Sequence, residues 1–336
     1  MATNPELLVE ALLNLAIAED IGDGDHSTLS CIPPSATGKV QLMMKQEGII
    51  AGLSVALKIF KKIDSSVEVE FFRGDGDLLR YGDIAFKAEG KVHSLLQAER
   101  LVLNVLQRMS GVATQTREYV NRCEGTKAKI LDTRKTTPGM RILDKMAVVI
   151  GGGMNHRMGL FDMIMLKDNH IDFAGGIENA VALAHKYLNE TGRKLAVEVE
   201  ARSLKDVQVI LRVGGVNRIM LDNFSVEATR EAVGMIGGRV ETESSGGITL
   251  ENIRDYALCG VDFISVGALT HQIRSIDMNL KKIWIAASAL RVIAEQSFSQ
   301  PSNPTRFLLK HQLKEKLELE HFSLLTRIFT RKISTA

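Results

Sequence analysis

The feature of this sequence that most constrains its fold is a succession of short aliphatic runs in residues 127–267, each stopping at a charged, hydroxylated or glycine residue. The last four units are evenly spaced, with equivalent positions 22 residues apart at Glu200, Asp222, Ser244 and Val266. This interval accommodates a strand, a helix and two short loops, which is the unit of a (β/α) barrel. We therefore predict buried parallel strands whose ends collect the polar side chains on one rim.

The segments between these runs have the signals of helices. Three of them open at Ser203, Ser225 and Thr249 and close on glycine. Hydroxylated residues cap helix N-termini, and glycine commonly ends helices. An open, doubly wound sheet would also alternate strands with helices, so this pattern alone leaves that alternative beside the barrel.

The chain before the repeats has a different character. A helix is expected over residues 5–20, with Asn4 as its cap and Pro5 in its first turn. Residues 38–90 have alternating runs broken by glycine–aspartate turns, with a helix near residues 53–62, which predicts a small α+β domain on an antiparallel sheet. A long helix over residues 94–120 should join the two parts. The predicted domains are an N-terminal α+β domain with its linking helix, an α/β barrel domain and a C-terminal extension, helical or partly ordered, at residues 1–120, 121–290 and 291–336.

Composition excludes several classes of protein. With 45% hydrophobic and 24% charged residues, the 336-residue chain is an ordinary globular protein, and its net charge of +2 is too small to indicate a nucleic-acid or membrane surface. No segment approaches the ~20 apolar residues needed to cross a bilayer. Cys31, Cys123 and Cys259 lack metal-site spacing, and the acidic N-terminal segment lacks a targeting pattern, so we expect a reducing compartment, the cytoplasm.

Positive side chains are concentrated between residues 132 and 170. The five potential cations of this region are Arg134, Lys135, His156, Arg157 and Lys167. Arginine offers a rigid fork for carboxylates and phosphates, and lysine a mobile point charge, so a small polyanion is the expected ligand. The alternatives are a solvated charged face and, for the histidine, an ordinary hydrogen-bonded structural residue.

Two acids end neighbouring units of the repeat. Glu200 and Asp222 should project from adjacent strands towards the same mouth, opposite the cations. Such a pair can hold Mg²⁺ while substrate phosphates complete its coordination. Either acid could instead be an ion-pair partner of Lys167 or Arg134.

Glycines near the last two strand ends are candidates for binding phosphate. Ser245, Gly246 and Gly247 precede one expected helix, and Gly267 and Ala268 open the next. Helix N-termini bind anions, and the last two units of α/β barrels often form a phosphate site. The glycine-rich segment 151–159 matches neither the dinucleotide nor the P-loop fingerprint, so its glycines could serve packing alone.

At these motifs the chain closely resembles the quinolinate phosphoribosyltransferases, also called nicotinate-nucleotide pyrophosphorylases. The matching segments cover roughly residues 6–281 in the family's order and include EDIGDGDHST, AERLVLNVLQRMSG, DTRKTTPGMR, GGGMNHRMGLFDMIMLKDNHI, VEVEARS, LDNFS, ESSGGITLENI and SVGALTH. The resemblance implies an N-terminal α+β sandwich domain followed by an incomplete, seven-stranded TIM-like barrel. It also implies conversion of quinolinate and phosphoribosyl pyrophosphate, with Mg²⁺, into nicotinate mononucleotide, pyrophosphate and carbon dioxide for NAD synthesis.

The resemblance also assigns residues. Arg100 should reach a neighbouring subunit's site, because family members are dimers or larger with shared active sites. The residues expected in the basic pocket are Thr133, Arg134, Lys135, His156, Arg157 and Lys167. Glu200 and Asp222 should lie near the ribose and Mg²⁺, directly or through water. The residues expected at the phosphate end are Ser245, Gly246, Gly247, Val266, Gly267, Ala268 and His271. Catalytic roles fall to Lys135, Lys167, Glu200 and Asp222.

Three other functions compete with this one. A barrel paralogue associated with molybdenum transport operons would act on another aromatic acid. A Schiff-base aldolase would use Lys167, a lysine at a strand end, to form an imine. A ligand-binding module would sense a phosphorylated metabolite, although paired acids beside a ribose would then have no purpose. About fifty residues after Ser288 match nothing in the family, and an added subunit contact is one hypothesis for them.

Overall fold

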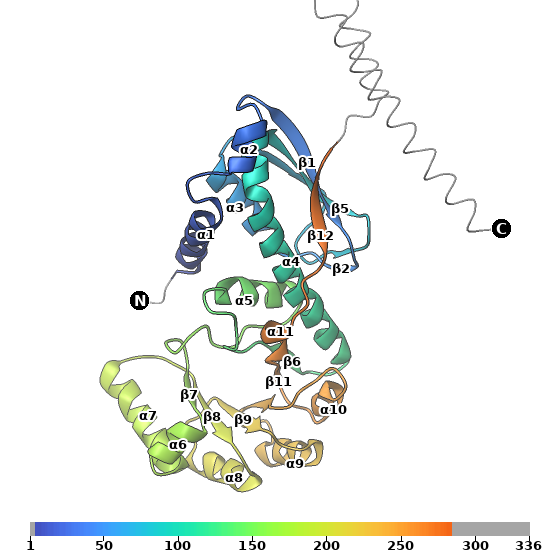
Figure 1. Cartoon of the computed structure of the whole chain (residues 1–336). Helices are drawn as coiled ribbons and strands as arrows, with labels where there is room; N and C mark the ends of the chain where they lie inside the picture. Colours follow the sequence, from blue (N-terminus) through green and yellow to red (C-terminus); the bar gives the residue numbers. More distant parts are fainter. Residues whose placement is uncertain (1–3, 284–336) are drawn as a thin grey trace, which may run out of the picture. The chain divides into compact units, whose positions relative to one another are not determined.

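The computed structural model describes residues 4–283, and the predicted C-terminal extension lies outside them. The antiparallel sheet of the N-terminal part has the order β12-β1-β5-β3. Its strands are β1 (Thr37–Met44), β3 (Glu68–Phe71), β5 (Ile84–Lys91) and β12 (Met278–Lys282). β12 therefore returns from the far end of the sequence to pair with β1, with Leu42 opposite Leu280 (Figure 1).

The remaining N-terminal elements match the sequence prediction closely. They are α1 (Pro5–Ile21), α2 (His26–Cys31), β2 (Gly48–Ile49), α3 (Leu53–Ile63), β4 (Leu78–Leu79) and α4 (Val92–Arg122). Asn4 caps α1 by accepting a hydrogen bond from the Glu6 amide, as expected. The three helices predicted at residues 5–20, 53–62 and 94–120 are thus confirmed, each within about two residues at either end.

The second part is a parallel sheet with helices on its outer face. Among residues 4–283 it has six strands in the order β6-β11-β10-β9-β8-β7. They are β6 (Lys129–Leu131), β7 (Ile164–Leu166), β8 (Val197–Ala201), β9 (Arg218–Asp222), β10 (Glu241–Ser245) and β11 (Phe263–Ser265). Met154 adds a single parallel bridge to Leu131 beyond β6. These are the seven positions of the predicted incomplete barrel, and the doubly wound alternative is wrong because the strand order is sequential.

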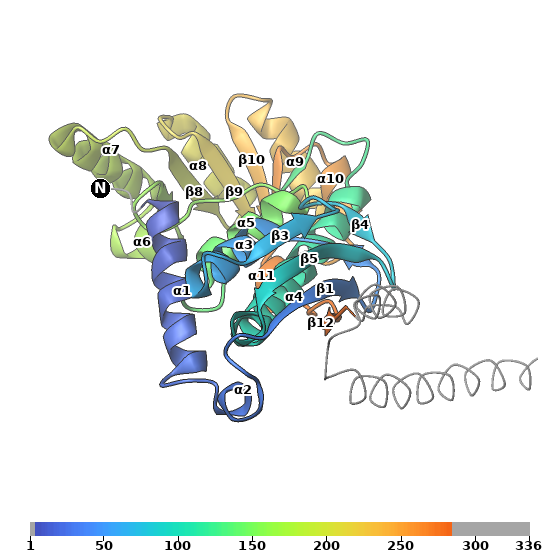
Figure 2. The same cartoon turned by 90° about the horizontal axis from the view of Figure 1, so that it is seen from above.

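Helices connect the strands and cover them (Figures 1 and 2). They are α5 (Arg141–Ile150), α6 (Asp168–Phe173), α7 (Ile177–Thr191), α8 (Leu204–Val213), α9 (Val226–Ile236), α10 (Ile253–Leu258) and α11 (Ala268–His271). Ser203 and Ser225 cap α8 and α9 as predicted. The cap expected at Thr249 is wrong. The Asn252 side chain accepts from the Thr249 amide and donates to the Gly247 carbonyl, which holds this segment in a turn, so α10 begins only at Ile253.

α4 runs from the antiparallel sheet to the barrel and packs against both (Figure 1). Ser110 and Thr114, on α4, accept hydrogen bonds from the amides of Ala51 and Ile49. On the barrel side, Gln115 donates to the Ala268 carbonyl, 2.9 Å away. A Cβ at Gly111 would overlap the Arg274 carbonyl, so glycine permits the close approach of the segment that leads to β12. The described chain up to Lys282 accordingly forms one compact unit.

Within the described residues, no helix is both long and apolar enough to cross a membrane. The domain limits predicted at residues 120 and 290 stay a prediction. β12, which lies before residue 290, belongs to the N-terminal sheet and not to the barrel.

Candidate active site

The alternation of side chains along β8 separates two faces of the barrel wall. Val197, Val199 and Ala201 pack into a buried cluster with the outer helices. Glu198 and Glu200 are also buried, and side chains two residues apart in a strand share a face, so both carboxylates lie on the inner side. Glu200 is the one nearer the carboxyl end of β8, where reactive groups gather in α/β barrels.

The acids predicted at the rim come from neighbouring strands. Asp222 ends β9, and in the parallel ladder it pairs with Ser245, which ends β10. Glu200 is 5% exposed, and its carboxylate lies 3.4 Å from Nζ of Lys167. The alternative that Glu200 is an ion-pair partner of Lys167 is thus confirmed. The same contact places a cation and an acid of the predicted site side by side.

Two arginines from separate loops are electrostatically coupled. Burial, and then the positive charge of Arg134, lower the pKa of Arg157. Arg141 connects the two loops, because its guanidinium donates to the carbonyls of Arg134, at 3.4 Å, and Met158, at 3.3 Å. Nε of Arg134 is buried and has no hydrogen-bond partner within the described chain. Two like charges held together with an unpaired donor favour an anionic ligand.

The loop that follows β6 is anchored from below by a fully buried ion pair. Asp132 accepts a hydrogen bond from Nζ of Lys145, on α5, and from the amide of His156 at 2.8 Å. Lys145 also donates to the His156 carbonyl at 3.0 Å. This pair therefore holds the start of the Arg134 loop and the start of the Arg157 loop at one point.

The ring of His156 faces the barrel interior. Its Nε2 lies 3.1 Å from Glu198 and 3.4 Å from Glu243, whose side chains are fully buried. Burial acts to lower the pKa of His156, but these two carboxylates outweigh it and raise the pKa to about 9. Sequence reasoning missed Glu198 and Glu243, although their alternation with Glu200 and Ser245 was a visible signal.

Lys135 follows β6 and contacts the segment that follows β11, the strand paired with β6. Its carbonyl accepts from Oγ1 of Thr270 at 2.8 Å, and a Cβ at Gly267 would lie 3.2 Å from the Lys135 side chain and 2.9 Å from Nε2 of His271. The Val266 amide donates to the Leu131 carbonyl, so the end of β11 is joined to the end of β6. Lys135, Gly267 and His271 are therefore neighbours. Ala268 begins α11, a helix of only four residues.

The Ser245–Gly247 segment has a different setting from the one expected. The late start of α10 means that Gly246 and Gly247 do not open a helix, which corrects the phosphate argument made from a helix N-terminus. Gly246 has φ +90°, and a Cβ there would overlap Oδ1 of Asn223, which itself has φ 55°. Asn223 donates to the Asp222 carboxylate at 2.7 Å. The segment therefore approaches the rim acids through its backbone.

Two predicted residues lie away from these contacts. Arg100 is exposed on α4, and its predicted contact with a neighbouring subunit stays a prediction. Thr133 uses its hydroxyl to accept from the Lys135 amide at 3.0 Å, so it shapes the loop that carries the cations.

Sequence reasoning gave Arg108 no role, although it is tied to the same loop. Its guanidinium binds the buried carboxylate of Asp144 through two hydrogen bonds, at 2.8 and 2.9 Å. It also donates to Oγ1 of Thr137 at 2.9 Å. The only signal in the sequence was that Arg108 falls outside the helical spacing of the leucines and valines of α4.

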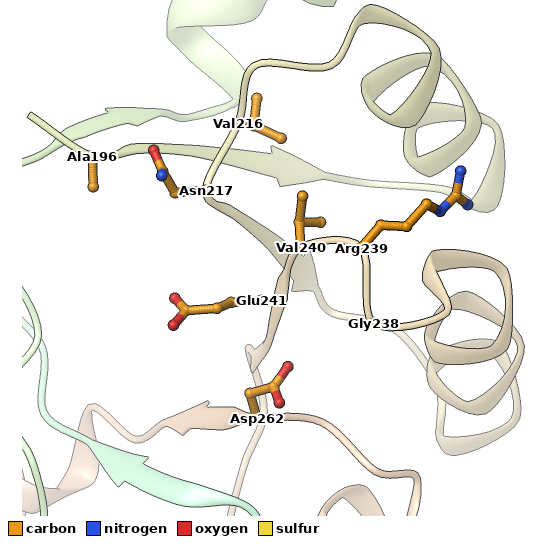
Figure 3. A pocket seen from close by; sticks show the side chains of 8 residues that line it. All are labelled: Ala196, Val216, Asn217, Gly238, Arg239, Val240, Glu241 and Asp262. Carbon is orange, nitrogen blue, oxygen red and sulfur yellow. The ribbon is translucent and has the colours of Figure 1, made fainter.

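A shallow pocket of about 630 Å³ lies at the opposite end of the barrel (Figure 3). Its lining comes from the amino ends of β8 to β11 and the loops before them: Ala196, Val216, Asn217, Gly238, Arg239, Val240, Glu241 and Asp262. The Arg239 guanidinium points away from the hollow and donates to the Ile236 and Met235 carbonyls. Because the predicted cations and rim acids are at the carboxyl ends, this pocket is not the candidate site.

The rim acids suit a hard cation. Glu200 and Asp222 offer carboxylate oxygens, which Mg²⁺ prefers, and they come from adjacent strands. The Lys167 and Asn223 contacts occupy part of their capacity, which leaves few protein ligands and suits a cation completed by substrate phosphates and water.

Comparisons with known proteins show the family to which the chain belongs. Residues 25–110 match the N-terminal domain, and residues 112–281 the C-terminal domain, of the family model for quinolinate phosphoribosyl transferase. The chain is 44% identical to the chloroplastic nicotinate-nucleotide pyrophosphorylase (carboxylating) of Arabidopsis thaliana, over 83% of this chain and 84% of that protein. Its rice counterpart is 43% identical over 83% of this chain and 78% of that protein. The crystal structure of NadC from Streptococcus pyogenes aligns with a TM-score of 0.78 and 38% identity, over 84% of this chain and all of that one.

Proposed function

The chain belongs to the quinolinate phosphoribosyltransferase family, and from this premise we propose that the carboxyl-terminal rim of its barrel is the active site of a decarboxylating phosphoribosyltransferase. The enzyme joins quinolinate to the phosphoribosyl group of phosphoribosyl pyrophosphate in NAD biosynthesis. Pyrophosphate, carbon dioxide and nicotinate mononucleotide are the products. The observation that carries the assignment of the site is the coupling of Arg134 and Arg157, whose two loops are held together by Arg141.

The charge pattern suits the substrates. Quinolinate is a dicarboxylate and phosphoribosyl pyrophosphate is a polyanion, so the two repel one another in water. Arg134 and Arg157 bind the carboxylates of quinolinate, since an arginine fork matches a carboxylate in a bidentate manner. Holding two such molecules in reacting geometry can lower a barrier by ~7–11 kcal/mol.

The acids act where positive charge develops. As pyrophosphate leaves, C1 of the ribose becomes positive, and Glu200 and Asp222 stabilise that charge from fixed positions. Lys167, paired with Glu200 at 3.4 Å, orients that carboxylate. The pyridine nitrogen then bonds to C1 and becomes cationic, which favours loss of the adjacent carboxylate as carbon dioxide. The ring carbon keeps the electron pair of the broken bond and takes a proton from water. The protein supplies no covalent nucleophile.

The leaving group and the 5′-phosphate require donors of their own. Lys135, beside Gly267 and His271, is the proposed cation for the pyrophosphate. The backbone amides of the Ser245–Gly247 and Val266–Ala268 segments are proposed to receive the 5′-phosphate, because successive amides in such turns can cradle an anion.

Mg²⁺ is the proposed cofactor. Glu200 and Asp222 would hold it, directly or through water, together with substrate oxygens. When bound, the ion neutralises charge on the departing pyrophosphate. Equilibrium dialysis of the protein with Mn²⁺ as a paramagnetic substitute, with and without phosphoribosyl pyrophosphate, tests this independently of turnover. Glu200→Gln should weaken Mn²⁺ retention in the ternary mixture.

Two wider proposals follow from the family. We propose a homodimer or larger assembly in which Arg100, exposed on α4, enters the neighbour's site. Sedimentation of the wild type tests the assembly, and the activity of Arg100→Ala tests the role of this side chain.

We also propose a cytoplasmic location, supported by three free cysteines, which fit a reducing compartment. The Arabidopsis and rice relatives are named chloroplastic, and other relatives mitochondrial, so imaging of the tagged chain is the test.

The experiment that tests the function is product analysis. Purified enzyme is given phosphoribosyl pyrophosphate and Mg²⁺ with either quinolinate or nicotinate. Nicotinate mononucleotide and carbon dioxide in equal amounts from quinolinate, and little product from nicotinate, support the proposal. Turnover of a different aromatic acid would favour the paralogue, and borohydride trapping at Lys167 would favour the aldolase. Binding without any turnover would favour the sensing module.

A further inference from the structure

Three ionisable side chains meet inside the barrel, beneath the proposed site. Glu198, on β8, and Glu243, on β10, direct their carboxylates from either side of β9 to Nε2 of His156, at 3.1 and 3.4 Å. Both carboxylates are fully buried, and neither the two oxygens of Glu198 nor Nε2 of His156 has a hydrogen-bond partner in the described chain, so the contact between them is an ion pair. Burying a charge costs free energy unless the charge is paired, so the two carboxylates need positively charged neighbours.

The contacts of the ring locate its proton. The Arg157 amide donates to Nδ1 of His156 at 2.6 Å, so Nδ1 serves as the acceptor and Nε2 carries hydrogen. A second proton would have to lie on Nδ1, against the Arg157 amide, so this contact opposes the rise in the pKa of His156 that the two carboxylates produce and favours the neutral ring with its hydrogen on Nε2. A metal ion would need the lone pair of Nε2. The three side chains are close enough together for a metal site, but Nε2 carries its hydrogen, so the ring meets the two acids at ion-pair distance instead of offering a lone pair to a metal.

Glu243 is held from its far side. Nη1 of Arg218 donates to Glu243 at 3.0 Å, and the same guanidinium binds Glu241 and lies 3.9 Å above the Phe263 ring. Arg218 thus fixes Glu243 and offsets one of the two buried negative charges. The Glu243 carboxylate therefore cannot easily turn away from the histidine.

The other side of His156 faces the site. Its backbone is anchored to Asp132 and Lys145, at 2.8 and 3.0 Å, which fixes its position, whereas the orientation of the ring depends on its own contacts. The ring in turn accepts the amide hydrogen of Arg157, and the charge of Glu198 acts on the Arg157 guanidinium. Both buried acids therefore face the ring, and Glu198 also acts on the residue next to it.

We propose that Glu198 and Glu243 are positioning residues for the dicarboxylate substrate. They pair with the Nε2 edge of His156 from two strands, fix the imidazole, and through Nδ1 set the direction from which Arg157 meets a substrate carboxylate. This rests on the proposed function, because it assigns Arg157 to quinolinate. Neither acid touches the substrate.

The test is a comparison of three glutamine variants. Glu198→Gln and Glu243→Gln replace the carboxylates at nearly unchanged volume. Each should raise the KM for quinolinate about tenfold, the range expected for one lost hydrogen bond to a positioned group, with kcat and the KM for phosphoribosyl pyrophosphate within about twofold of wild type. Glu241→Gln is the matched control, because Glu241 shares β10 and Arg218 but is exposed and has no contact with His156. Equal effects of all three variants would overturn the proposal.

A double-mutant cycle separates positioning from general support of the fold. In a His156→Asn background, Glu198→Gln should change the quinolinate KM by less than about twofold, since its route to Arg157 is gone. Full additivity would contradict a pathway through His156. Nitrogen NMR of the labelled wild-type histidines needs no variant to fold, and it should show a protonated, slowly exchanging Nε2 in His156. An unprotonated Nε2 would also overturn the proposal.

The proposed function and the positioning role of the two glutamates can be refuted separately. If the wild type does not convert quinolinate, the proposed function fails. If it does, and Glu198→Gln and Glu243→Gln behave like Glu241→Gln, only the positioning role fails.

Discussion

Lys145 and Asp132 form an ion pair in which both side chains are fully buried. Burial raises the pKa of Asp132 and lowers that of Lys145, so the surroundings oppose charge on both partners. The pair persists because Asp132 also accepts the His156 amide and Lys145 also donates to the His156 carbonyl. A charge pair of this kind fixes two loops at one point, beneath the cations of the site.

Lys145→Met should destabilise the protein strongly. Methionine leaves the Asp132 carboxylate buried without a cation, and breaking a buried pair from one side typically costs ~3–5 kcal/mol. Urea denaturation at pH 7 measures the change in the free energy of unfolding. The control is Lys127→Met, which removes a pair with Asp262 whose lysine is 58% exposed and should cost under ~1 kcal/mol. Similar losses in both variants would contradict the buried-pair account.

Much of this architecture was predictable from the sequence. The 22-residue spacing of Glu200, Asp222, Ser244 and Val266 gives the barrel units, because strands and helices of similar length must alternate. β12 was not predicted as a member of the N-terminal sheet. Its pairing with β1 joins residues more than two hundred positions apart, and no local pattern encodes such a partner.

The candidate site was likewise predictable only in part. The cations and rim acids are at strand ends, so the sequence indicated them. Glu198 and Glu243 have the same residue type as Glu200, and only the inward direction of their side chains, together with His156 approaching from a separate loop, gives them a role. The start of α10 was misplaced because the Asn252 side chain competes with a cap at Thr249.

Arg108→Lys should reduce catalytic efficiency. Lysine keeps the charge but cannot bind the Asp144 carboxylate through two parallel hydrogen bonds and reach Thr137 as well. The loop carrying Arg134 and Lys135 should lose order, and we expect kcat/KM for phosphoribosyl pyrophosphate to fall about tenfold. Arg80→Lys, at a surface pair with 78% of the arginine exposed, is the control and should leave kcat/KM unchanged. A wild-type value for Arg108→Lys would show that the loop does not depend on this contact.

Asp64 should titrate far below an ordinary aspartate. Hydrogen bonds from the Ser66 and Ser94 hydroxyls, and from the Ser66 amide, hold its pKa at about 2. Because the folded pKa is depressed, the stability from this group is present above the unfolded value of 3.8 and is lost as the pH falls towards 2. Carbon NMR of the carboxylate should give the low value in wild type and a higher one in Ser94→Ala. An identical titration in both proteins would rule out the Ser94 contribution.

The three cysteines should differ in reactivity. Cys31 is exposed, whereas Cys123 and Cys259 are buried. Burial raises the pKa of the Cys123 thiol to about 11, so little thiolate forms near neutral pH. At pH 8 a disulfide reagent should modify one thiol of the native protein rapidly and the other two only after denaturation. Rapid modification of Cys31→Ser would show that a second thiol is accessible.

The central claim is that the cations and acids at the carboxyl ends of the barrel strands bring quinolinate to phosphoribosyl pyrophosphate. Its most direct test is release of labelled carbon dioxide from carboxyl-labelled quinolinate, measured with Mg²⁺ in wild type, Arg157→Ala and Arg239→Ala, the last being an arginine at the opposite end of the barrel. We predict release with wild type and Arg239→Ala, and a rate at least about a hundredfold lower for Arg157→Ala at low quinolinate, as expected when a charged hydrogen-bonding partner is lost. Equal release by all three proteins would contradict the account.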